Sequence, residues 1–204
     1  YWTESYFSNH FVWSNSFSKE SETRFSVTFS APQIGLELGG YQSLLGDRIY
    51  YGADQLPAQY GGTVTVSGLY AQKDFRFGGL HLNSAEEVVP VPAISAYLSY
   101  YFEFNVVKNV LRLQLGLDGR YNTSYYAFGY NPATAQFYNQ REKKLGNYPM
   151  IDVFAAAKWK RMRILIKMQH LNENMFGDRN YFTVLHYPQN PRMFKLGVSW
   201  SFYD

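Results

Sequence analysis

The chain has 204 residues and a formal net charge of +3, and its Lys and Arg residues are spread along it rather than gathered into a basic patch. This dispersion argues against nucleic acid as a partner, because nucleic-acid binding needs a clustered cationic footprint. The absence of cysteine excludes disulfide frameworks and thiolate metal sites, and no run of about 18 apolar residues is present to form a transmembrane helix.

Aromatic residues make up 19% of the chain, with 19 Tyr and 16 Phe, although the mean hydropathy is slightly negative. A barrel that crosses a bilayer hides its hydrophobicity by alternating apolar and polar residues, and it places aromatic girdles at both interfaces. The composition therefore favours this class over an ordinary soluble core.

Alternation with a period of two residues predicts the strands in chain order. A first strand is expected around residues 6–17, followed by shorter ones at residues 24–29, 34–40 and 64–70. The clearest alternation comes later, at residues 94–104, 111–121, 151–159, 163–169 and 192–203. In the last segment, apolar side chains from Phe194 to Phe202 oppose small or cationic ones, and the strand ends at Tyr203, as is common in outer-membrane barrels.

The connections between strands also alternate in length, as in bacterial barrels with short periplasmic turns and long external loops. Counting back from the last strand, the long connections are residues 172–191, 122–149, 83–92 and 53–62, and the short ones are residues 160–162, 105–109 and 72–74. Nearer the start, residues 18–21 and 43–47 are interpreted as periplasmic turns and residues 31–33 as a brief external one. This interpretation gives about eleven strands.

An odd number of strands is unusual, because a single-chain bacterial barrel normally has an even number and starts from the periplasm. We therefore expect an all-β, antiparallel transmembrane β-barrel. Residues 1–204 would form one domain, the C-terminal part of a larger barrel that has further N-terminal strands. A complete barrel of this length with a one-strand miscount stays open as an alternative.

Four stretches carry a family resemblance: residues 6–15, 54–62, 146–154 and 186–204. The most specific is the Tyr-Pro-x-Asn-Pro-Arg loop that begins at Tyr187 and leads into the final strand. Together they resemble the putative porin family of Bacteroidota outer membranes, over essentially the whole chain. The resemblance implies an outer-membrane barrel more strongly than it implies transport.

The inward face of such a barrel lines water, a plug or packed side chains. Most of the charged residues predicted to face inward are cationic, so a lumen that they line should mildly prefer anions. The alternative that inward Arg and Glu only pair with each other across strands is left open. The predicted lining residues are Arg24, Glu37, Arg76, Glu103, Arg112, Asp118, Arg120, Asp152, Lys158, Arg163, Lys167 and Lys195.

Enzyme, cofactor and metal functions find little support. His10, His81, His170 and His186 are isolated, and neither a Gly-x-Ser-x-Gly elbow nor a His-Glu-x-x-His pair occurs. His170, at the end of a predicted strand, is interpreted as a residue of the apolar face. The aromatic residues in the loop at residues 121–149 suggest loop packing at the interface or, as the weaker alternative, stacking of a sugar.

Two functional hypotheses remain. The first is an outer-membrane porin-like channel for passive diffusion of small hydrophilic solutes, and the second is a closed barrel that acts as a scaffold or accessory subunit of a larger outer-membrane complex. Expected partners are outer-membrane lipid and, through the C-terminal strand, the barrel-assembly machinery, with other outer-membrane subunits as further candidates. A soluble β-sandwich binding module is disfavoured by the alternating loop lengths.

Overall fold

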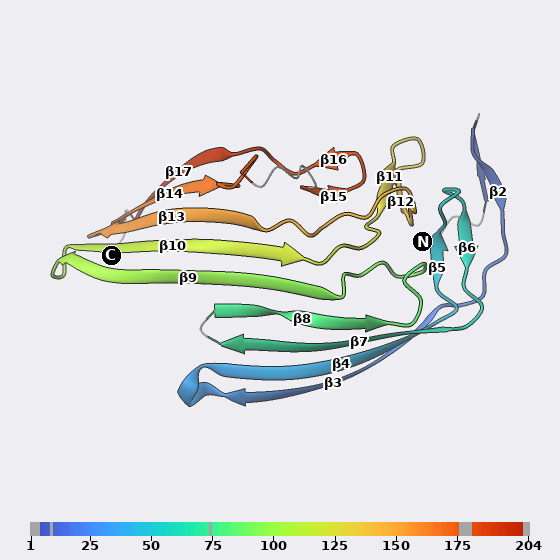
Figure 1. Cartoon of the computed structure of the whole chain (residues 1–204), viewed down its shortest axis with the longest axis horizontal. Helices are drawn as coiled ribbons and strands as arrows, with labels where there is room; N and C mark the ends of the chain where they lie inside the picture. The colour runs from blue at the N-terminus through green and yellow to red at the C-terminus, as the bar shows by residue number, and fades with distance from the viewer. Residues whose placement is uncertain (1–4, 9, 74, 176–180, 202–204) are drawn as a thin grey trace.

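The computed structural model describes residues 5–8, 10–73, 75–175 and 181–201, without the side chains of residues 73–79. Nine strands form one antiparallel sheet in the order β17-β14-β13-β10-β9-β8-β7-β4-β3 (Figure 1). They are β3 (Ser21–Ala31), β4 (Leu36–Gly46), β7 (Thr63–Lys73), β8 (Phe75–Asn83), β9 (Ile94–Val107), β10 (Leu111–Asn122), β13 (Met150–Trp159), β14 (Met162–Gln169) and β17 (Met193–Trp200). The expected all-β, antiparallel class is confirmed. In the described part of the chain, no helix is long and apolar enough to cross a membrane.

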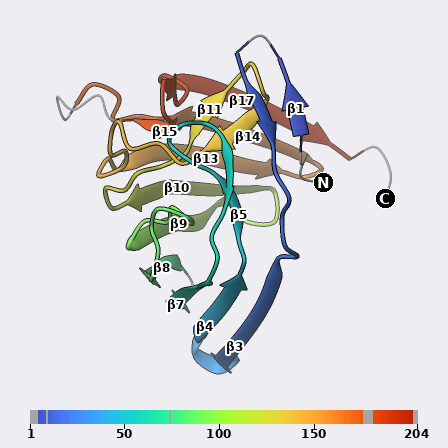
Figure 2. The same ribbon diagram turned by 90° about the vertical axis from the view of Figure 1, so that its right-hand side faces the viewer.

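The sheet is an open meander, in which each strand pairs with the sheet strands before and after it in the chain. Figure 2 shows it bent into an arc, with β3 and β17 at the two edges. Because the direction alternates over nine strands, the two edge strands run the same way, so they could not pair antiparallel with each other. Within the described residues no closed barrel is observed, and barrel closure stays a prediction.

The cross-strand register separates two faces of the sheet. Directly paired residues share a face, and neighbours along a strand alternate between faces. On one face Arg112, Lys158 and Arg163 follow one another across β10, β13 and β14. On the other, Leu115 pairs with both Phe102 and Ala155. We call these the polar face and the apolar face.

The apolar face is uncovered. Its large side chains are solvent-exposed on strands at both edges and in the middle of the sheet. The following residues on this face are each more than half exposed: Phe25, Val27, Phe29, Leu69, Leu82, Phe102, Phe194, Leu196, Val198 and Trp200. A soluble monomer rarely exposes a continuous apolar patch of more than a few hundred Å². A surface of this kind requires an apolar environment.

Long and short connections lie at opposite ends of the sheet, which we call the loop end and the turn end. The turn end carries the η1 turn (Pro32–Ile34) between β3 and β4, and tight reversals at Asn109 and Lys160, both at positive φ. The loop end holds four long connections, which contain the hairpins β5 (Ile49–Tyr51) with β6 (Pro57–Gln59), β11 (Gly129–Asn131) with β12 (Gln136–Tyr138), and β15 (Phe182–Val184) with β16 (Tyr187–Pro188).

Four expectations for the first part of the chain are wrong. Residues 18–21 are not a turn at the turn end, because β3 begins at Ser21 and reaches the turn end only at Ala31. Residues 6–17 do not form one strand but a small hairpin of β1 (Ser5–Phe7) and β2 (Val12–Ser14) outside the main sheet. Residues 43–47 are not a turn at the turn end, because β4 continues to Gly46 and residues 47–62 form one long loop, closed by a hydrogen bond from Asp47 N to Gly62 O (3.0 Å). Residues 31–33 lie at the turn end, which explains their brevity. The sheet therefore has nine strands rather than about eleven.

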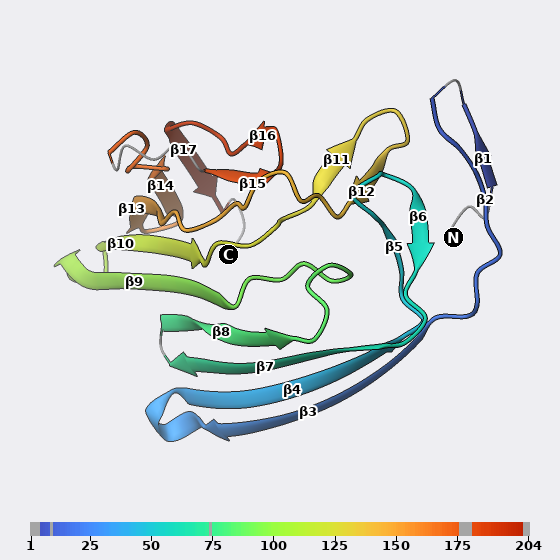
Figure 3. The ribbon, with the colours of Figure 1, turned by 45° about the vertical axis from the view of Figure 1, so that its right-hand side comes forward.

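The loops at the loop end are connected to each other. Asn139 N donates to Tyr51 O (2.7 Å), which joins the hairpins β11–β12 and β5–β6, and Leu185 N donates to Phe128 O (3.0 Å) beside β15 (Figure 3).

A small core of buried residues, Val64, Val66, Ala85 and Val88, lies where residues 84–91 cover the polar face of β7. The loops thus fold over the hollow side of the arc.

One junction in the sheet is much shorter than the others. β8 and β9 are in register only at Gly79 with Ser95 and at Leu80 with Ile94. Figure 1 shows β9 extending well beyond β8 toward the turn end. By contrast, the ladder between β9 and β10 extends from Val107 to Ser95.

Glycines on the polar face lie opposite aromatic rings. Gly39 pairs with Tyr70, Gly68 with Tyr41, and Gly116 with Phe154, and in each pair the ring occupies the space that a glycine Cβ would need. An aromatic ring that covers a facing glycine is a known way to pin strand register. These pairs fix the relative positions of β4 and β7, and of β10 and β13.

Substitution of Gly116 by Ala should destabilise the sheet by about 1–3 kcal/mol, because the new methyl group displaces the Phe154 ring and lies 2.9 Å from the carbonyl oxygen of Tyr100. The measurement is the temperature at which the folded protein loses its compact mobility on SDS gels. Gly119→Ala in the same strand is the matched control, because its Cβ would meet only the Leu98 Cβ at 3.8 Å. Equal transition temperatures for the two variants would contradict the role of the ring.

Candidate functional site

Every predicted lining residue whose side chain is described lies on the polar face. The register aligns Arg24 with Ser43, Glu37 with Gln72, Glu103 with Gln114 and Lys195 with Lys167, and the remaining predicted residues continue the same rows. Arg76 pairs with Gln72 through its backbone, but its side chain lies outside the described residues. The shared face is thus an observation, and its lining of a lumen stays a prediction.

The centre of the polar face holds two carboxylates bridged by one ammonium group. Lys167 Nζ lies 2.8 Å from Asp118 Oδ2 and 2.9 Å from Asp152 Oδ2. The Ser99 hydroxyl donates to Asp118 Oδ1 (2.8 Å), and an Arg120 guanidinium nitrogen lies 3.7 Å from Asp152 Oδ2. We call Asp118, Asp152, Lys167 and Arg120 the ionic cluster.

The register brings the ionic cluster together. Asp118 and Asp152 are direct cross-strand partners on β10 and β13, a position at which like charges repel. Lys167, one strand further on β14, reaches between them and neutralises this repulsion. The Asp152 side chain is only 2% exposed, so water cannot stabilise it. It is stabilised instead by Lys167 and by the hydrogen bond from His170 N to Oδ1 (2.9 Å).

The outer part of the polar face toward the turn end is cationic. Glu103 forms an ion pair with Arg112. Lys158 is the direct cross-strand partner of both Arg112 and Arg163, and among the described residues neither Lys158 nor Arg163 has an acidic partner. Lys195, which lies beside Lys167 and further from the turn end, has no acidic partner among these residues either. A hollow of about 620 Å³ toward the turn end is lined by Glu103, Arg112, Lys158 and Arg163 among others. The face therefore carries positive charge that the described acidic residues do not compensate.

A buried polar latch ties two long loops together at the loop end. The Tyr148 hydroxyl oxygen lies 2.7 Å from His170 Nε2 and 3.2 Å from Asn172 O, and His170 Nδ1 lies 2.9 Å from Asn190 O. Ile151 N donates to Asn172 Oδ1 (2.9 Å) at the start of β13. We call Tyr148, His170 and Asn172 the loop latch.

The position of His170 differs from the sequence-based interpretation. It is fully buried rather than part of the apolar face, because the backbone leaves the strand there with a φ of +55° and turns the ring toward the loops. Burial and the negative charge of Glu173 raise the pKa of the Tyr148 phenol, which therefore stays a protonated donor through the physiological range. Alternation alone gave no signal for the loop latch. It also gave none for the hydrogen bond between Ser99 and Asp118.

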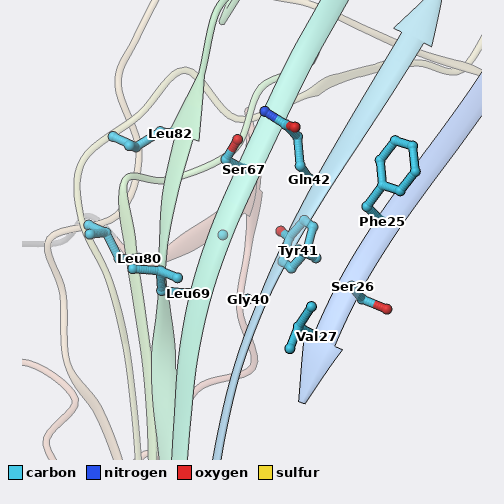
Figure 4. A pocket seen from close by; sticks show the side chains of 11 residues that line it. Phe25, Ser26, Val27, Gly40, Tyr41, Gln42, Ser67, Leu69, Leu80 and Leu82 are labelled. Atoms are coloured by element: carbon cyan, nitrogen blue, oxygen red, sulfur yellow. The ribbon is translucent and has the colours of Figure 1, made fainter. Parts of the chain in front are cut away.

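A second hollow, of about 370 Å³, lies mainly on the apolar face. Figure 4 shows apolar side chains of β3, β7 and β8, including Val27, Leu69 and Leu80, around Gly40 of β4. Most of the surface of this hollow is apolar, which fits a surface that faces hydrocarbon rather than a solute. In the part of the chain that the structure describes, no group of three or more His, Asp or Glu could hold a metal ion.

With the two faces and their charges established, comparison with known proteins identifies the family. A family model described as "Putative porin" matches residues 1–204, the whole of this chain. The chain belongs to this family. Searches of curated proteins and of solved structures returned no match. Membership of a porin family suggests an outer-membrane location and a channel-type role rather than catalysis.

Substitution of Lys167 by Met should destabilise this porin-family protein by about 2–4 kcal/mol, because two facing carboxylates, one of them buried, would lose their shared cation. The loss should be below that for a wholly buried pair, since the lysine side chain is 21% exposed. Thermal unfolding in detergent micelles measures the effect. Lys195→Met is the control, with an expected change within about 0.5 kcal/mol. Similar losses for both variants would show that the bridge contributes nothing.

Substitution of Tyr148 by Phe should loosen the two latched loops at a cost of about 1–2 kcal/mol, since one buried hydroxyl serves both His170 and Asn172. Limited proteolysis should then cut within residues 123–149 or 170–192 faster than in the wild type, with the sheet left intact. Tyr121→Phe, which removes only an exposed bond to Asn147, is the control. Unchanged cleavage in Tyr148→Phe would rule out the latch.

Proposed function

We propose that the chain forms part of the wall of an outer-membrane porin-like channel for passive diffusion of small hydrophilic solutes. The observation that carries this proposal is the difference between the two faces of the sheet: one carries exposed apolar side chains from edge to edge, and the other carries rows of charged residues and glycines. Membership of the porin family supports it at the level of the class.

The dimensions of the strands agree with a wall that spans a bilayer. Transmembrane β-strands need about 9–11 residues at a tilt of about 45°, and the strands of this sheet have 8 to 14 residues. Backbone groups inside a bilayer must all be paired, so the free edges of β3 and β17 need partners. Closure by further antiparallel strands is part of the proposal. Its expected partners are outer-membrane lipid on the apolar face and the barrel-assembly machinery at the final strand.

We further propose a mild preference for anions. Three of the acidic residues on the polar face, Glu103, Asp118 and Asp152, are in contact with basic ones. Lys158, Arg163 and Lys195 keep uncompensated charge among the described residues, and rings of Lys and Arg favour anions in aqueous pores. The ionic cluster stabilises the wall of the channel. Lys158, Arg163 and Lys195 make the electrostatic potential next to the wall positive.

A closed barrel that serves as a scaffold or accessory subunit is the second candidate. It is favoured by the bulk on the polar face, where the Phe154 ring covers Gly116 and the hairpin loops fold over the hollow side. The two candidates differ in a single property, the passage of ions through the inserted protein.

Single-channel recording in a planar bilayer under a salt gradient tests both proposals. The wild-type, full-length protein should give stable current steps with an anion-favouring reversal potential. Replacing Lys158, Arg163 and Lys195 together by Gln should shift that potential toward cations, because the uncompensated charge is removed. The double variant Glu103→Gln with Arg112→Gln is the control, since it removes an ion pair without a change in net charge.

Each outcome bears on a different part of the proposal. A cation-favouring potential in the wild type would contradict the anion preference and leave the channel intact. Silence from protein that is demonstrably folded and inserted would contradict the channel itself and favour the scaffold.

A further inference from the structure

A third hollow, of about 170 Å³, lies at the loop end where β10 and β13 meet the loop that contains β15 and β16. Its floor comes from the polar face, through Arg120, Asn122 and the buried Met150. Its walls come from the two latched loops. The lining residues contributed by those loops are Tyr125, Gly146, Tyr148, Tyr181, Phe182, Thr183 and Gln189, and the strand residue Tyr121 completes the lining.

The hollow contains polar groups that the protein does not satisfy. Among the described residues, the side chains of Asn122, Thr183 and Gln189 have no hydrogen-bond partner. Among the described residues Arg120 makes one ion-pair contact, of 3.7 Å with Asp152, and its side chain is 52% exposed, so other donors of its guanidinium are available to a ligand. By contrast, the hydroxyl groups of Tyr121 and Tyr148 are already occupied by Asn147 and by the loop latch. The residues with free donors and acceptors therefore come from β10 and from the loop that contains β15 and β16.

Aromatic rings form the apolar part of the same hollow. The centroids of Tyr148 and Tyr181 lie 5.8 Å apart, and Tyr181 stacks on Phe182 with an angle of 7° between the ring planes. Tyr125 lies on the same loop as Tyr148 and pairs with Leu145 of that loop through two backbone hydrogen bonds of 2.8 and 2.9 Å. Burial raises the pKa of its phenol, which keeps this ring uncharged. The apolar part of the hollow is therefore mainly aromatic.

We propose that this hollow binds a small acidic sugar of the uronic acid class. Its carboxylate would pair with Arg120, whose planar fork of donors matches carboxylate geometry. Its ring hydroxyl groups would exchange hydrogen bonds with Asn122, Thr183 and Gln189, which offer both donors and acceptors. The apolar face of its ring would lie against the tyrosines. A few convergent polar groups within aromatic walls are the usual form of a small-molecule site.

The size of the hollow limits the ligand. Its volume, about 170 Å³, is below the range of about 300–1,000 Å³ that is typical of drug-sized ligands, and equals the space of about five or six water molecules. A monosaccharide fits this description, whereas a long oligosaccharide could place only one unit inside. The site stands on the hollow itself, and its role as an entrance for solutes rests on the proposed channel function.

Isothermal titration of the full-length protein in detergent micelles tests the site, with D-glucuronate as the probe and D-glucose as the uncharged comparison. The wild type should bind glucuronate more tightly than glucose. Arg120→Gln should weaken glucuronate binding by about tenfold or more, because a hydrogen-bonded ion pair is lost, and should leave glucose binding within about twofold. Thr183→Val should weaken both sugars.

Arg141→Gln is the matched control. Arg141 is an arginine of the same loop as Tyr125, but it contacts Glu87 and the Tyr126 ring outside the hollow, so glucuronate binding should stay unchanged. All variants are first checked for the wild-type unfolding temperature.

Three results would overturn the proposal: no glucuronate binding by folded wild-type protein, equal affinities for glucuronate and glucose, or equal effects of Arg120→Gln and Arg141→Gln. Because no current is measured, these results are independent of whether the protein conducts. If the protein conducts ions but does not bind glucuronate, only the proposed site is contradicted. If it binds glucuronate but does not conduct, only the proposed channel function is contradicted.

Discussion

The cross-strand register is the constraint on which the rest of this structure depends. Since side chains alternate along each strand, a shift of one residue between neighbours would move a whole row to the opposite face. Here the glycine–aromatic pairs and the charge contacts all act on the same register: Phe154 can cover Gly116, and Lys167 can bridge Asp118 and Asp152, only in the alignment observed. Interactions that are each modest thus support one another across the sheet.

The long strands could be predicted from the sequence because their alternation is uninterrupted, as in residues 111–121, which lie within β10 (Leu111–Asn122). The prediction failed at residues 43–47, interpreted as a turn, because β4 continues to Gly46. After it, Ile49–Tyr51 has the composition of a strand but pairs within a loop hairpin, so that Tyr51 becomes buried. Which residues share the polar face followed from the period of two. Which of them touch did not, because Asp118 and Lys167 are far apart in the sequence and meet only through the intervening β13. His170 was missed because the strand ends there with a reversal of φ.

Charge on the polar face has two separate roles. At the centre, burial makes the acidic groups costly, so they are neutralised and the resulting contacts hold three strands together. Toward the turn end, the basic groups are exposed and keep their charge, which extends into the surrounding water over about a Debye length of 8–10 Å. Paired charges on the polar face therefore stabilise the sheet, whereas unpaired charges determine the electrostatic potential near it.

The short ladder between β8 and β9 divides the sheet into two panels, β3 to β8 and β9 to β17, in each of which every neighbouring pair of strands is joined by a longer ladder. Local opening of a protein begins where the fewest interactions must break. Lateral stress in the sheet would therefore concentrate along this seam, and the panels would move as rigid plates about it. A change in the angle along this seam would therefore change the curvature of the arc without bending any strand.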